Sequence, residues 1–128
     1  MTRLPICFAA VCLLQSFGSS EDALHLVNKQ RAIRGLGPLV RDEVLSEGAD
    51  KKASKAAETS YKGHLGGYKF GANYEGIGYD RRRIFRACYL YTAKAGSKVG
   101  AAIVKGRDGL NYCCLLIKSE SRLQPHPR

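Results

Sequence analysis

The chain has 128 residues, with 21 lysines and arginines against 11 aspartates and glutamates, and a formal net charge of +10. This length allows one domain with a modest hydrophobic core and leaves little room for a second. The positive charge favours encounters with anionic surfaces, but it does not distinguish lipid, glycan, nucleic acid or acidic protein.

Residues 1–20 are predicted to be a secretory signal peptide. Arg3 precedes an almost uncharged stretch at 4–17, and small residues follow up to Ser20. The stretch is too short to span a bilayer comfortably, although an N-terminal membrane anchor is the alternative. Cleavage after Ser20 predicts a secreted protein, extracellular or periplasmic, with no transmembrane segment.

A helix, a tight connector and a second helix are expected next. Apolar residues recur at helical spacing over 22–34, which predicts an amphipathic helix. Gly35 can end it in a left-handed conformation, Pro38 keeps the connector extended, and Asp42 can cap a helix that runs to about Ser60. The alanines of this second helix predict close packing against a sheet or another helix.

Glycines alternate with aromatic residues over 63–79, which predicts an irregular segment. It either forms a wall of a cleft or simply connects helix and sheet. Strands are predicted at 88–92, 99–104 and 112–117, the last two joined as a hairpin by the turn at 106–109. Residues 119–128 contain two prolines and are predicted to form a flexible basic tail.

Several positions in the first half of the chain match a known family pattern. They are Asn28, Arg31, Leu36, Pro38, Leu39, Asp42 and Leu45. In this order they resemble the opening of the CAP superfamily, the SCP-like extracellular proteins that include cysteine-rich secretory, antigen and pathogenesis-related proteins. Residues 98–102 and 111–115 look like the last two strands of that fold.

The resemblance implies an α+β fold, a minimal CAP-like α-β-α sandwich, for residues 21–118. The N-terminal helices are expected to pack on an antiparallel sheet. Only residues 80–87 separate Tyr79 from Cys88, so the chain has no room for the further helical region that the family carries there. It therefore looks like a shortened member, without a match for the second histidine or the second acid of the family's cleft.

The resemblance also implies a site at His64 and Glu75, beside Tyr74 and Tyr79. In the family, a histidine and a glutamate at these places belong to a cleft tetrad that binds a divalent metal in some members. Two of the four ligands predict weak zinc binding at most. A histidine oriented by a carboxylate is also a sufficient general base, but no Gly-x-Ser-x-Gly nucleophile motif is present. The alternative is a structural role, in which either side chain locks the glycine-rich loop.

Three cysteines follow the predicted signal peptide: Cys88, Cys113 and Cys114. The last two are adjacent on a predicted strand and point to opposite faces, so at most one of them faces Cys88. In an oxidising compartment, a disulfide of Cys88 with Cys113 or with Cys114 is expected. The remaining cysteine is either buried or free to form an intermolecular bond.

The resemblance and the residues together indicate a secreted, non-enzymatic protein that binds a lipid, a sterol or a protein partner near His64 and Glu75. One alternative is a metal-assisted hydrolase that uses the same pair. A second is a cationic effector that binds anionic surfaces, with Tyr79 and Phe85 adding stacking contacts. That effector would use a run of arginines, namely Arg81, Arg82, Arg83 and Arg86. The sequence contains no motif specific for nucleic acid.

Overall fold

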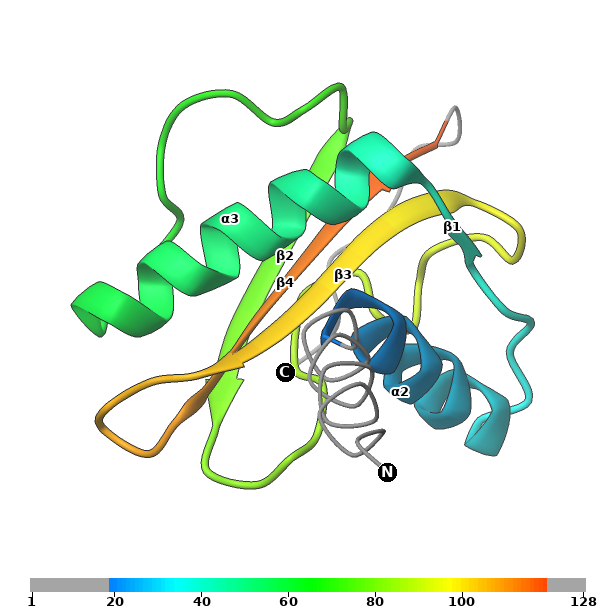
Figure 1. The fold of residues 1–128 in the computed structure, drawn as a ribbon. Coiled ribbons are helices and arrows are strands. Elements are labelled where there is room, and N and C mark those ends of the chain that lie inside the picture. The colour runs from blue at the N-terminus through cyan, green and yellow to red at the C-terminus, as the bar shows by residue number, and fades with distance from the viewer. Residues whose placement is uncertain (1–18, 120–128) are drawn as a thin grey trace, which may run out of the picture.

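The structure is a computed structural model that describes residues 19–119. It is α+β, as predicted, with two helices and four strands (Figure 1). Most of the predicted signal peptide and residues 120–128 of the predicted tail lie outside the described part. In chain order, the elements are α2 (Ser19–Ile33), β1 (Val40–Arg41), α3 (Glu43–Thr59), β2 (Tyr74–Asp80), β3 (Lys98–Lys105) and β4 (Asn111–Lys118).

The four strands form one sheet in the order β1-β3-β4-β2. The three long strands are antiparallel, because β4 pairs with β3 on one side and with β2 on the other. The expected hairpin at 106–109 is confirmed, since it connects β3 to β4. The short β1 adds a parallel pair, with Val40 opposite Lys98, so the sheet is mixed rather than wholly antiparallel.

The two helices cover opposite faces of the sheet, which confirms the predicted sandwich (Figure 1). Successive side chains of a strand alternate between the faces, so odd and even positions of β3 and β4 enter different cores. The core under α2 contains Val99, Ala101, Ile103, Cys113, Leu115 and Ile117. The core under α3 contains Ala102, Cys114 and Leu116, together with Leu45, Ala49 and Ala53 of the helix.

The connector between α2 and α3 follows the local signals of the sequence. Gly35 has a φ of 74°, the left-handed conformation expected after the first helix. The side chain of Asp42 accepts a hydrogen bond from the backbone nitrogen of Leu45 at 3.0 Å, which caps α3 as predicted. The Asn28 amide group also bonds both the nitrogen and the oxygen of Leu39, at 2.8 and 3.1 Å, and so fixes the connector against α2.

The predicted strand at 88–92 is wrong, because these residues form turns. Tyr89 has a φ of 70°, which is incompatible with a strand. The surrounding segment instead covers part of the sheet on the α2 side, where it buries Phe85, Ala87 and Leu90. Tertiary packing therefore overrides the aromatic, strand-like composition of this stretch.

The segment 63–79, predicted to be irregular, ends in a strand. Residues 74–80 form β2, and only the part before them is irregular. Gly76 and Gly78 lie within the strand, where a Cβ would collide with the backbone carbonyls of Cys88 and Arg86. The two glycines are therefore needed for close backbone approach, a use of glycine in strands that composition alone does not separate from a loop.

Candidate functional site

The structure brings His64 and Glu75 together. His64 lies in the segment that follows α3, and Glu75 lies on the α3 side of β2. Nδ1 of His64 is 2.8 Å from Oε1 of Glu75, within hydrogen-bond distance. The Glu75 side chain is 5% exposed, whereas the His64 side chain is 56% exposed. A buried carboxylate thus holds a histidine whose ring is open to solvent.

Lys52 of α3 is a third member of this site, and sequence reasoning missed it. Its Nζ lies 3.0 Å from Oε2 of Glu75, an ion pair whose angle does not meet hydrogen-bond geometry. The same ammonium donates to the carbonyl of Leu65 at 3.2 Å. One signal could have found it: Lys52 follows Ala49 by three residues, so it lies on the buried stripe of the helix.

The charges around Glu75 determine its protonation. Burial works against the carboxylate and by itself raises its pKa, but the hydrogen bond with His64 and the ion pair with Lys52 outweigh this, so the pKa of Glu75 lies below its ordinary value. Glu75 is therefore ionised at neutral pH. It acts as a hydrogen-bond acceptor and as the counter-charge of Lys52, not as a general acid.

We expect Glu75→Gln to lower the free energy of unfolding by about 2 kcal/mol at neutral pH, because it leaves the buried Lys52 without its counter-charge. A carboxyl whose pKa is lower in the folded state adds stability above its ordinary pKa of 4.5, and this is lost as the pH falls through the folded value. The difference between wild type and Glu75→Gln should therefore shrink on acidification. Urea unfolding of both proteins at neutral and acidic pH measures this difference in stability.

Glu47→Gln is the matched control, because Glu47 lies on α3, the helix that carries Lys52, and has an exposed side chain. It should leave the stability almost unchanged at every pH. Adding Lys52→Met to Glu75→Gln should restore part of the loss, since the unpaired ammonium is then removed as well. Equal stability of wild type and Glu75→Gln at neutral pH would show that the pair contributes nothing.

The hollow beside Glu75 is small. It has a volume of about 20 Å³ and is bordered by Lys52, Tyr79 and Cys114 among others. This is enough for about one water molecule, far below the roughly 300 Å³ of the smallest ordinary ligand pockets. A ligand that meets His64 therefore lies on the outer surface and not inside a cavity.

The two predicted tyrosines lie on opposite faces of β2. Tyr79 is on the α3 face with Glu75, is 40% exposed, and has Nζ of Lys62 at 5.6 Å from its ring centre. Tyr74 points to the α2 face instead, where its ring centre is 5.2 Å from that of Tyr89. The structure thus places Tyr79, but not Tyr74, at the site of His64 and Glu75.

The residues described, 19–119, contain no group of three or more His, Cys, Asp or Glu side chains placed to hold a metal ion. In addition, the Lys52 ammonium occupies the approach to Oε2 of Glu75, so a cation that bound Glu75 through this oxygen would have to displace it.

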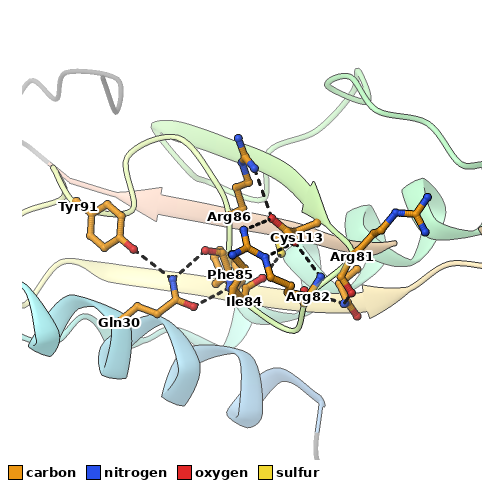
Figure 2. Close-up of polar contacts among 10 residues, drawn as sticks. Gln30, Arg81, Arg82, Ile84, Phe85, Arg86, Tyr91 and Cys113 are labelled. Carbon is orange, nitrogen blue, oxygen red and sulfur yellow. Dashed lines mark hydrogen bonds and ion pairs between the residues drawn. The ribbon is translucent and has the colours of Figure 1, made fainter. Parts of the chain in front are cut away.

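Two arginines of the run form hydrogen bonds to an acidic residue, Asp80, which sequence reasoning also missed. Asp80 accepts hydrogen bonds from Arg82 at 3.0 and 3.1 Å and from Arg86 at 3.4 Å (Figure 2). The hydrogen bonds from Arg82 hold the pKa of Asp80 far below its usual range. Arg81 and Arg83 are exposed and have no acidic partner in the described part of the chain. The loop therefore keeps an excess of positive charge.

All three described cysteines are free. Cys113 lies in the core under α2 and Cys114 in the core under α3, so the expectation that they point to opposite faces is confirmed. Burial raises the pKa of the Cys113 thiol to about 11, and raises that of Cys114 still further. The structure forms no bridge from Cys88 to either of them, and the disulfide stays a prediction for the oxidised protein.

No helix within 19–119 is both long enough and apolar enough to cross a membrane. No protein-family model matches the sequence, and no curated protein matches it. The CAP resemblance therefore depends on the residues quoted for it above.

Proposed function

We propose that this protein is a secreted, shortened CAP-like binding module without enzymatic activity. The observation that carries the proposal is the 2.8 Å contact between Nδ1 of His64 and Oε1 of Glu75. These are the two cleft residues that the resemblance implies, and they come from different elements. The two helices on opposite faces of the sheet are also consistent with the family's sandwich.

Two features favour binding over hydrolysis. Both oxygens of Glu75 already have partners, His64 at Oε1 and Lys52 at Oε2, so a divalent metal competes with an ammonium group already in place. Two thiols border the small hollow, those of Cys113 and Cys114, and burial raises the pKa of each above the ordinary value. A buried neutral thiol is a poor nucleophile.

The ligand of this module contacts its exposed surface rather than entering a cavity. A protein partner therefore fits better than a lipid tail. A hollow of about 20 Å³ accommodates a water molecule and no hydrocarbon chain. The solvent-facing ring of His64 and the exposed ring of Tyr79 are the groups that a partner would contact. Histidine and tyrosine both combine an apolar ring with a polar tip, a property that suits interfaces.

Mass spectrometry of the protein purified from its own host, without reducing agent, tests this proposal. We expect a mass for residues 21–128, reduced by two hydrogens if one disulfide forms, and no retained zinc under native conditions. Titration with zinc should give no stoichiometric complex, since two ligands hold the metal weakly. His64→Ala should then leave zinc binding unchanged.

The matched control is His25→Ala, because His25 is an exposed histidine on α2. Stoichiometric zinc that is lost in His64→Ala but kept in His25→Ala would contradict the proposal and make the hydrolase the better hypothesis. A mass that includes residues 1–20 would contradict cleavage of the signal peptide.

A cationic effector is the second candidate, and one observation favours it. The arginine loop is fixed in place because Asn111 donates to the carbonyls of Arg81 and Arg82, at 3.3 and 2.9 Å (Figure 2). The backbone of the loop is therefore ordered, and the exposed side chains of Arg81 and Arg83 extend from it. Binding through them would be governed by charge and would weaken as salt is raised.

A further inference from the structure

An open groove of about 700 Å³ lies beside β2, and neither His64 nor Glu75 is among its lining residues. This volume is within the range of about 300 to 1,000 Å³ that binding sites usually have. Three stretches of chain line it: residues 77–79 of β2, residues 84–91 except Tyr89, and Arg34 just after α2. The groove thus combines a strand, an ordered loop and a cation.

The wall of the groove is fixed before any ligand arrives. The Gln30 side chain of α2 accepts from the backbone nitrogen of Phe85 at 2.7 Å and donates to its carbonyl at 2.9 Å (Figure 2). It also lies 3.3 Å from the hydroxyl of Tyr91. On the other side, the carbonyls of Arg86 and Cys88 pack against the two glycines of β2. A wall held at both sides loses little freedom when a ligand binds.

The strand that borders the groove is at the edge of the sheet. β2 pairs with β4 on one side and has no strand on its other side within 19–119. Residues 77–79 make no backbone hydrogen bond to any described segment other than β4. Such an edge offers amide and carbonyl groups to an added strand, which is a common way of binding extended peptides.

The charge at the groove favours an acidic partner. The guanidinium of Arg34 lies 3.6 Å from the ring centre of Tyr91, and its only described partner is that ring. Arg86 also lines the groove, with a single long contact of 3.4 Å to Asp80. Arginine groups with unused donors bind carboxylates well, often through two parallel hydrogen bonds.

We propose that this groove binds an extended acidic peptide, which adds as a strand to the free edge of β2. Its backbone pairs with residues 77–79, its carboxylates contact Arg34 and Arg86, and its apolar side chains pack on Ile84 and Tyr79. The site shares Tyr79, but no charged residue, with the His64–Glu75 site, and it does not depend on the proposed function. A peptide is favoured over a polyanionic glycan because only a peptide supplies backbone partners for a strand edge.

Fluorescence anisotropy with short labelled peptides tests the proposal on the whole protein. The probe is a peptide in which glutamate and valine alternate. A second peptide keeps every glutamate but carries proline in place of the central valines, which removes backbone donors without changing charge. We expect the first to bind and the second to bind about tenfold more weakly. A peptide of alternating lysine and valine should not bind.

Variants of the protein locate the site. Arg34→Gln combined with Arg86→Gln should weaken binding of the acidic peptide by about tenfold or more. Lys55→Gln combined with Arg107→Gln removes the same charge at exposed positions outside the groove, and should change binding little. Amide shifts in NMR spectra should then be largest in residues 77–79.

Two outcomes would overturn the proposal. If the proline peptide binds as well as the alternating one, the strand edge is not used. If heparin or anionic vesicles compete fully, and both double variants weaken binding equally, the protein binds by charge alone, as the cationic effector would. The comparison of peptides needs only the wild-type protein, so it remains decisive even if a variant fails to fold.

Discussion

Arg31→Ala is expected to lower the free energy of unfolding by about 4 kcal/mol, a loss at the upper end of what single substitutions cause. The Arg31 side chain is 1% exposed. Its Nε donates to the carbonyl of Gly37 at 2.8 Å, and its Nη1 donates to the carbonyl of Leu90 at 2.8 Å. Alanine would leave both carbonyls without donors and would open a cavity under α2.

The position of these two carbonyls explains why the effect should be large. Gly37 belongs to the connector between the helices, and Leu90 to the loop that covers the α2 face. One guanidinium thus joins α2 both to the connector that follows it and to a loop 59 residues further along the chain. Burial lowers the pKa of Arg31 from its usual value, which means that desolvation opposes its charge and the two carbonyls must compensate.

Urea unfolding followed by circular dichroism measures this loss. Arg31→Lys should recover only part of it, because a single ammonium cannot reproduce the planar fork that reaches two carbonyls. Arg107→Ala is the control, since Arg107 is exposed in the hairpin turn, and its loss should be within about 0.5 kcal/mol. A similar small loss for Arg31→Ala would contradict its role as a buried connection.

The second large effect is expected for Gly100→Ala, at about 3 kcal/mol. Gly100 lies at the centre of the sheet, on the β3 face that α3 covers. A Cβ at this position would collide with the carbonyl group of Leu45 and crowd the nitrogen of Ser46, which are backbone atoms of the first turn of α3. Backbone atoms cannot rotate aside as a side chain can, so the helix itself must move away from the sheet.

Thermal and urea unfolding of Gly100→Ala test this close approach. The control is Gly66→Ala, because Gly66 is exposed and an added Cβ there meets no atom within 4 Å. The control should be neutral or slightly stabilising, since alanine restricts the unfolded chain. If Gly100→Ala unfolds at the same urea concentration as wild type, the helix does not approach the strand this closely.

Local signals in the sequence predict much of the fold correctly. Gly35, the Asp42 cap and the 106–109 turn each act within a few residues, so their outcome does not depend on the rest of the chain. The error at 88–92 and the strand missed at 74–80 share one cause. β2 packs against the segment that contains Arg86 and Cys88 through backbone contacts at Gly78 and Gly76, and such packing between two segments leaves no periodic pattern in either of them.

The candidate site shows the same contrast between what the sequence marks and what only the assembled fold determines. His64 and Glu75 could be named because a family resemblance marked them, and the structure places them in contact. The spacing from Ala49 places Lys52 on the buried stripe of its helix, and Asp80 lies two residues before Arg82, but neither position by itself identifies the contact that the side chain makes. Whether a lysine on a helix meets a glutamate on a strand depends on the rotation of the helix over the sheet, and only the assembled fold determines that.

The central position of β4 also constrains the order in which this chain can fold during synthesis. β4 pairs with β3 and β2 on its two sides, and supplies residues to both cores, yet it follows both of these strands and both helices in the sequence. Until a ribosome has released residues 111–118, β2 has no neighbouring strand and neither core can close. We therefore expect the sheet and both cores of the described residues to be completed only after β4 has emerged.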